Sequence, residues 1–159
     1  MVNRLNENLP KSVVLTHPHT GMSYITGAYA ISAANAVFGE PNWSYEITDM
    51  DIGDKAVIAR VKLTALIEGQ TVVREDVGVG VLAIKRGTAE ATGQNLDLGV
   101  KSAVTDGLKR CLRTFGRAFG LKLYAMDSGL YDETHEPDER WVVDNSREAD
   151  NSRGWELNR

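Results

Sequence analysis

The sequence lacks the residues needed for disulfide bonds within the chain and for membrane-spanning helices. Its 159 residues include a single cysteine, Cys111, so no disulfide can form within the chain. No apolar run approaches the roughly 18 residues that a membrane-spanning helix needs, and residues 1–15 lack the basic and then apolar pattern of a signal peptide. We therefore expect a protein of a reducing, cytoplasmic compartment, without membrane contact.

The motifs of common enzyme classes are also missing. No GxxxxGK[ST] phosphate loop occurs, and Gly78-x-Gly80 lacks the third glycine of a dinucleotide-binding fingerprint. His17 and His19 supply two potential metal ligands, whereas a catalytic zinc site requires a third. Cys111 falls within an apolar stripe, which favours a buried, inert thiol over a nucleophile. We expect no enzymatic activity, no metal and no organic cofactor.

Basic residues are outnumbered by acidic residues over the whole chain but are concentrated in one segment. The chain carries 18 basic and 22 acidic residues, a net charge of −4, which by itself argues against a polyanionic partner. Residues 127–159 hold ten acidic and four basic side chains, whereas residues 99–122 hold six basic side chains and one acidic. We predict one folded domain over residues 1–126, followed by an acidic and largely disordered tail over residues 127–159.

Two helices are predicted from apolar residues spaced three and four positions apart. The first follows Thr26, a favourable N-cap residue, and ends before Gly39. The second runs from Asp97 to about Phe119 and carries a continuous apolar stripe. Residues 12–25 contain short β-branched runs interrupted by proline and glycine, which predicts a loop or a weak hairpin.

Three strands are predicted between these helices. Apolar side chains alternate along residues 57–67, and turn residues on both sides indicate antiparallel pairing with residues 45–50 and 71–81. Gly78 and Gly80 in the third strand are explained by strand curvature or by a close approach of the long helix or a nucleic-acid strand. The expected fold class is α+β: a three-stranded antiparallel meander packed against one long amphipathic helix, with a short N-terminal helix.

Basic side chains recur on the long helix at intervals of four residues. Lys109, Arg113 and Arg117 are predicted to form a ridge opposite the apolar stripe, which is either a solvated face or a polyanion-binding surface. Arg60 and Lys62 lie on the non-core face of the central strand and are explained by solvation alone or by a groove shared with the helix. In the second case, phosphates would run between the helix and the sheet.

Several ordered segments of the chain resemble one known family. The clearest is residues 103–116, with the core AVTDGLKR, and it follows the run EDVGVG at residues 75–80. YITG at residues 24–27 and NW at residues 42–43 occur in the matching order. Over residues 24–124 the sequence resembles the annealing domain of the Rad52 family of recombination proteins.

This resemblance implies a function and an assembly. The family anneals complementary single strands without ATP in recombination and double-strand-break repair. Its β-β-β-α domain assembles into closed rings and holds single-stranded DNA in a basic outer groove. We accordingly expect a ring-forming homo-oligomer that binds single-stranded DNA, located in the nucleoid-associated cytoplasm of a bacterial or phage-infected cell.

The resemblance also assigns site residues. Those that match the DNA-contacting helix of the family are Lys109, Arg110 and Arg113. A second DNA site is expected near Lys85 or Arg86. Tyr29 stands where family members often carry an arginine, and its ring can stack on a base instead. Arg117 replaces an uncharged residue and restores positive charge.

Alternative interpretations remain for the domain and for the tail. The same sheet-and-helix surface would also suit a duplex RNA or DNA binding module that does not anneal, and a small hydrolase is a more distant alternative. In the tail, Trp141 and Trp155 lie among acidic residues, where they can anchor a recombination or replication protein. The tail is otherwise a solubilising segment or a DNA mimic that competes for the basic ridge.

Overall fold

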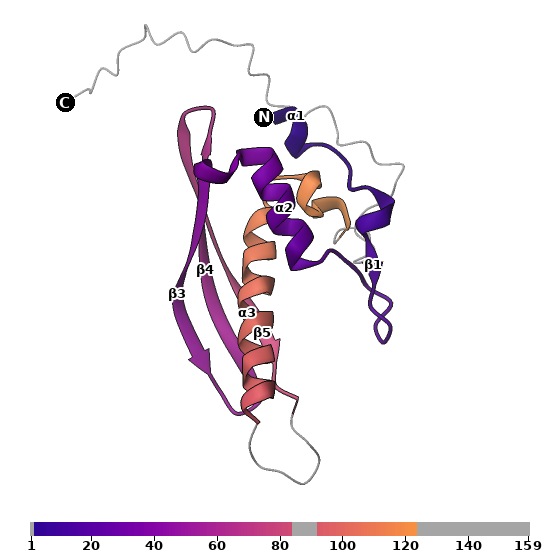
Figure 1. The fold of residues 1–159 in the computed structure, drawn as a ribbon, viewed down its shortest axis with the longest axis vertical. Coiled ribbons are helices and arrows are strands. Elements are labelled where there is room, and N and C mark those ends of the chain that lie inside the picture. The colour runs from indigo at the N-terminus through magenta and orange to yellow at the C-terminus, as the bar shows by residue number, and fades with distance from the viewer. Residues whose placement is uncertain (1, 84–91, 124–159) are drawn as a thin grey trace, which may run out of the picture.

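A three-stranded sheet covered on one face by a long helix forms the body of the protein (Figure 1). The computed structural model describes residues 2–83 and 92–123. The strands β3 (Trp43–Ile52), β4 (Ala56–Ile67) and β5 (Gln70–Val81) pair antiparallel in the order β3-β4-β5, and α3 (Gly93–Arg113) packs on β4 and β5. The predicted α+β fold with a β-meander and one long helix is confirmed.

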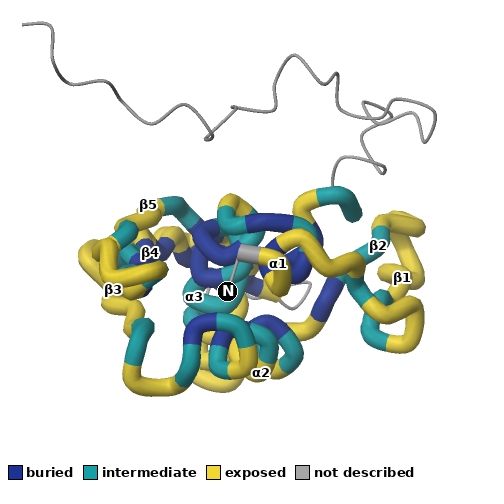
Figure 2. Tube along the Cα trace, turned by 90° about the horizontal axis from the view of Figure 1, so that it is seen from above, coloured by how far each residue is buried: buried dark blue, intermediate teal, exposed yellow. Residues whose placement is uncertain are grey.

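The central strand β4 alternates between the two faces of the sheet, as its sequence predicts. Its apolar side chains that face α3 are fully buried; they are Val57, Ala59, Val61, Leu63 and Ala65 (Figure 2). The intervening residues Ile58 and Arg60 are exposed on the opposite face. A period of two therefore sets both the core and the outer surface of the sheet.

The helix α3 approaches β5 closely because both elements present small residues to each other. Gly99, Ala103 and Gly107 are buried on the sheet side of α3. A Cβ atom added at Gly78 would collide with the backbone of Ala103 and Gly107, and one added at Gly80 would collide with the backbone of Gly99 and Ala103. The two strand glycines thus permit the close packing of the helix, one of the explanations that the sequence leaves open.

The ends of α3 differ from the prediction at both termini. The helix begins at Gly93, four residues earlier than expected, where the Thr92 hydroxyl accepts a hydrogen bond from the Asn95 amide at 3.3 Å. It ends at Arg113, because Gly116 has φ 150° and lies against the Leu5 backbone. The predicted continuation to Phe119 is wrong, since residues Arg117–Phe119 form a separate 3₁₀ turn, η3.

The N-terminal part of the chain packs across the C-terminal half of α3. It comprises α1 (Val2–Leu5), η1 (Lys11–Val13), the hairpin strands β1 (Leu15–Thr16) and β2 (Ser23–Tyr24), α2 (Gly27–Phe38) and η2 (Glu40–Asn42). The prediction for α2 is confirmed: the Thr26 hydroxyl accepts from the Tyr29 amide at 3.1 Å, and Gly39 ends the helix with φ 84°. Phe38 stacks on Phe119 with ring centroids 5.5 Å apart, which joins α2 to η3.

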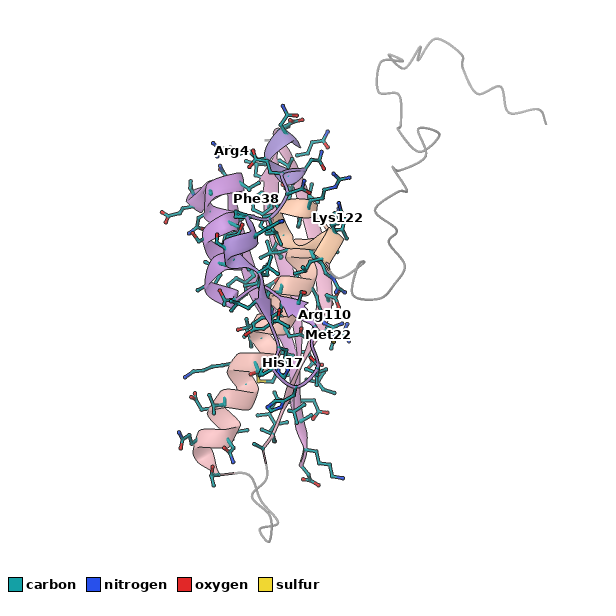
Figure 3. All side chains as sticks on the ribbon, turned by 90° about the vertical axis from the view of Figure 1, so that its right-hand side faces the viewer. Arg4, His17, Met22, Phe38, Arg110 and Lys122 are labelled. Carbon is teal, nitrogen blue, oxygen red and sulfur yellow. The ribbon has the colours of Figure 1, made fainter. Side chains whose placement is uncertain are left out.

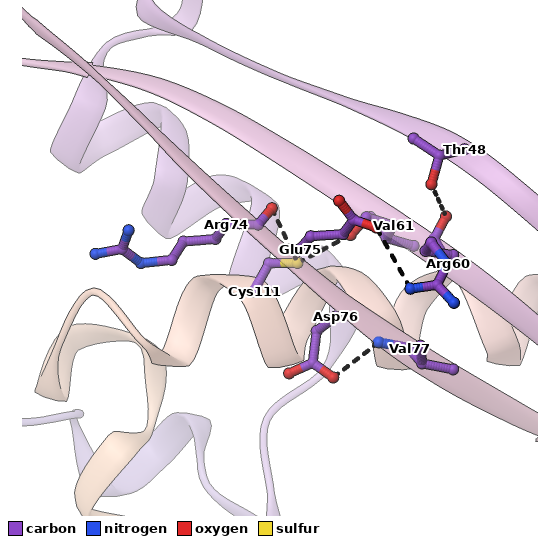
Figure 4. Close-up of polar contacts among 8 residues, drawn as sticks. All are labelled: Thr48, Arg60, Val61, Arg74, Glu75, Asp76, Val77 and Cys111. Carbon is purple, nitrogen blue, oxygen red and sulfur yellow. Dashed lines mark hydrogen bonds and ion pairs between the residues drawn. The ribbon is translucent and has the colours of Figure 1, made fainter.

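The single cysteine lies in the interface between α3 and the sheet. The Cys111 thiol is fully buried and donates to the Val61 carbonyl at 3.3 Å (Figure 4). Burial raises its pKa from 9.0 to about 11, with the charge of Asp76 a smaller contribution in the same direction. Within the described residues, no helix is long and apolar enough to span a membrane, and no group of three or more potential metal ligands occurs.

We expect the Cys111 thiol to resist alkylation by a maleimide at about pH 8 in the folded protein and to react rapidly in urea. Because the folded-state pKa is raised, the thiol favours folding below pH 9, and this contribution is lost as the pH rises toward 11. In Cys111→Ala, the free energy of unfolding should therefore decrease less between pH 9 and pH 11 than it does in the unmodified chain. Rapid alkylation of the native protein, without prior unfolding, would contradict the buried placement.

Candidate nucleic-acid interface

An open groove runs along the solvent side of α3, next to the edge strand β5. Its volume is about 540 Å³, and its lining residues are Val79, Val81, Leu98, Lys101, Ser102, Thr105, Asp106, Lys109 and Arg110. Three of these side chains are cationic and one is acidic. Hydroxyl and cationic groups thus line a concave surface of the kind that binds phosphates.

Asp106 connects the helix to the sheet edge and positions one of the cations. Its Oδ2 atom accepts a hydrogen bond from the Val79 amide at 3.2 Å and another from Arg110 Nε at 2.9 Å. The Arg110 contact uses one of the five N–H donors of a guanidinium. Asp106 therefore holds Arg110 at the groove through Nε. The planar guanidinium, with its fork of N–H donors, is a group suited to binding phosphate.

Lys109 is less exposed than its sequence position predicts. Its Nζ atom donates to the Ile25 carbonyl at 3.3 Å, which lies just before α2. Burial lowers the pKa of the ammonium, and the negative charge of Asp106 partly opposes that effect. Lys109 is therefore not a fully solvated side chain, because the segment just before α2 lies against α3 at this point. Lys109 both lines the groove and holds the segment before α2.

Of the three residues predicted to form a ridge at four-residue spacing, Lys109 and Arg113 both lie on α3. Arg117 is not part of it, since the helix ends at Arg113 and Arg117 lies in η3. The structure adds Lys101 to the lining of the groove, at the same spacing and two turns before Lys109. The four-residue spacing by itself indicates that Lys101 belongs to the same helix face. Lys101 also forms an i,i+4 ion pair with Asp97 at 2.7 Å, however, and such pairs are typical of an ordinary solvated helix surface.

Arg60 and Lys62 lie on the face of the sheet that points away from α3. They alternate with the buried residues of β4 that contact the helix, so they project in the opposite direction. Arg60 pairs with Glu75 at 3.5 Å (Figure 4), and Lys62 pairs with Glu46 at 2.8 Å. The expectation of one groove shared by the helix and these strand cations is therefore wrong in its geometry.

The remaining predicted residues fall elsewhere. Tyr29 packs against the main core from α2, and burial raises its pKa. It lines a separate pocket of about 470 Å³ together with Arg4 and Ala118, apart from the groove along α3. Base stacking by Tyr29 in that groove is thus not supported by its position. Lys85 and Arg86, the expected second DNA site, lie outside the described residues, as does the predicted tail over residues 127–159.

Comparisons with known proteins identify relatives of this chain. A family model described as Rad52/22 family double-strand break repair protein matches residues 1–142. The DNA repair and recombination protein RAD52 of Kluyveromyces lactis is 37% identical over 112 residues, which cover 67% of this chain and 25% of that protein. RAD52 of Saccharomyces cerevisiae is 36% identical over 118 residues, covering 67% of this chain and 23% of that protein.

A third relative extends the range of organisms. The DNA repair and recombination protein rad22 of Schizosaccharomyces pombe is 31% identical over 111 residues, covering 65% of this chain and 23% of that protein. The chain spans about a quarter of the length of these relatives. All three come from fungi, so the expected bacterial or phage-infected cell is contradicted. On the evidence of its fold, its helix motif and these matches, the chain belongs to the Rad52/22 family of double-strand break repair proteins.

Proposed function

We propose that this domain binds single-stranded DNA along α3 and anneals complementary strands without ATP, in recombination and double-strand-break repair. The observation that carries the proposal is the groove lined by Lys101, Lys109 and Arg110, with Arg113 about one turn further along the same helix. The proposal agrees with the printed names of the relatives, which are DNA repair and recombination proteins.

The chemistry of this site is non-covalent. Cations four residues apart on a helix are separated by a rise of about 6 Å, so one face can contact several phosphates of an extended strand. With the backbone neutralised on the protein, the bases remain free to test pairing with a second strand. Each correct base-pair step contributes about 1.4 kcal/mol of stacking, so pairing itself drives annealing.

We further propose that the domain works as a homo-oligomer, with a closed ring as the assembly. Strand β3 lies at one edge of the sheet (Figure 1). Its residues Tyr45, Ile47 and Ile52 pair with β4 residues that face α3, and they are between 43% and 53% exposed. An exposed apolar edge of this kind suits contacts between copies of the chain, and head-to-tail contacts generate a ring when the rotation closes.

Replacing Ile47 and Ile52 together by lysine is expected to convert the oligomer to monomers, because two charges would enter the apolar contact. Size-exclusion chromatography with light scattering measures this as a drop to the mass of one chain. The matched control is Ile58→Lys, a similarly exposed residue on the outer face of β4, which should keep the oligomer. An unchanged mass for the double variant would exclude β3 from the contact.

The proposed function is tested by comparing affinities for a single strand and for a duplex of the same length. We expect the single strand to bind more tightly at equal salt, measured by fluorescence anisotropy. Preference for the duplex, without acceleration of annealing, would instead support the alternative of a non-annealing duplex RNA or DNA binding module.

A further inference from the structure

A second cationic pocket, which includes Lys122 (Figure 3), lies between the segment around η1 and the segment around η3. It has a volume of about 320 Å³ and is lined by Asn8, Leu9, Lys11, Val14, Arg117, Lys122 and Leu123. Its lining shares no residue with the groove along α3. We call it the η1–η3 pocket, because Lys11 belongs to η1 and Arg117 to η3.

The composition of the η1–η3 pocket suits an acidic ligand with some apolar character. Three of its described lining residues are cationic and none is acidic, while Leu9, Val14 and Leu123 provide an apolar wall. Arg117 and Lys122 are half-buried, so their charges are less screened than those of fully exposed side chains. Lys11, Arg117 and Lys122 come from distant parts of the chain, and one anionic ligand in the pocket can contact all three cations.

The continuation of the chain supplies such a ligand. The last described residue, Leu123, itself lines the pocket. Residues 127–139 follow after three residues and contain no lysine or arginine; their six acidic side chains are Asp127, Asp132, Glu133, Glu136, Asp138 and Glu139. At about 3.3 to 3.6 Å per residue, an extended chain from Leu123 carries these carboxylates across the whole pocket. The short connection also gives them an effective concentration in the millimolar range.

We propose that the acidic stretch 127–139 of this chain docks in the η1–η3 pocket as an intramolecular ligand. Its carboxylates pair with Lys11, Arg117 and Lys122, and the apolar wall takes Leu130 or Tyr131 from the same stretch. This contact neutralises a cationic surface that would otherwise attract nucleic acid. The docking itself does not depend on the proposed DNA binding.

The test uses the 159-residue chain with its own acidic stretch neutralised by Asp132→Asn, Glu133→Gln, Glu136→Gln, Asp138→Asn and Glu139→Gln. The probe is a fluorescent peptide with the unaltered sequence of residues 127–139. We expect the peptide to bind this variant about tenfold more tightly than the unmodified chain, whose pocket is occupied by its own stretch. Anisotropy at low salt measures both affinities, and added salt should weaken binding.

Variants of the pocket decide whether the site is correct. Lys11→Glu, at an exposed position that tolerates substitution, and Arg117→Ala with Lys122→Ala should each reduce peptide binding at least about fivefold in the neutralised chain. Arg110→Ala, in the groove along α3, should leave it unchanged. Peptide affinity that is equal with and without the neutralised stretch, or that depends on Arg110 and not on the pocket, would overturn the proposal.

Nucleic acid is the competing occupant of the pocket. If Arg117→Ala with Lys122→Ala lowered the affinity of the unmodified chain for a single-stranded oligonucleotide while the peptide failed to bind, the pocket would belong to DNA and the proposal would be wrong. If no variant of this chain bound DNA but the peptide still required the pocket, the docking would stand and the proposed function would fail.

Discussion

Gly80→Ala is expected to destabilise the domain by about 3 kcal/mol or more, and Gly78→Ala by a similar amount. At either position the new methyl group meets the backbone of α3, which cannot rotate away as a side chain can. Relief would require α3 to move off β5, with loss of packing over much of the core. Urea unfolding followed by circular dichroism measures the change as a shift in midpoint.

Gly93→Ala is the matched control for this prediction. It adds the same methyl group at the start of α3, where nothing lies within 4 Å of the new atom. The control should change the free energy of unfolding by no more than about 0.5 kcal/mol. Equal small effects at all three positions would show that the close contact between α3 and β5 is absent.

Replacing both Arg110 and Arg113 by alanine is expected to lower the affinity for single-stranded DNA roughly 100-fold. In the proposed site, each arginine would form a charge-assisted contact with a phosphate worth about 1.5 to 3 kcal/mol, and the double variant removes both contacts. The slope of log affinity against log salt should become less steep by about 1.4, because each phosphate contact contributes about 0.7 for single strands. Lys109 is left intact because it also holds the Ile25 carbonyl.

Arg60→Ala with Lys62→Ala provides a control that removes the same charge from the opposite face of the sheet. Both residues already pair with glutamates there, so their loss should reduce DNA affinity only slightly. Thermal unfolding should show that both double variants remain folded. If the two double variants lost affinity equally, general electrostatics rather than the α3 groove would account for binding.

Local sequence patterns predicted those features of the fold that depend on residues close together in the sequence. The alternation along β4 identified its buried face, and Thr26 with Gly39 marked the ends of α2. These features depend on strand period and capping, which short segments encode directly. The spacing of Lys109 and Arg113 likewise placed both on one face of α3.

Tertiary contacts account for what the sequence did not reveal. The end of α3 depends on Gly116, whose backbone lies against Leu5, more than 100 positions away. The half-buried state of Lys109 depends on the segment before α2, and the direction of Arg60 relative to the groove depends on which sheet face the helix covers. None of these relations can be read from the spacing of residues along one element.

In the proposed function, the cationic face of α3 promotes pairing of complementary single strands. The most direct measurement is the rate of annealing of two complementary oligonucleotides, one carrying a fluorophore and the other a quencher, without ATP. We expect the unmodified chain to accelerate annealing well above the spontaneous rate, and Arg110→Ala with Arg113→Ala to return it close to that rate. Annealing at the spontaneous rate with the unmodified chain, or undiminished acceleration by the double variant, would contradict the claim.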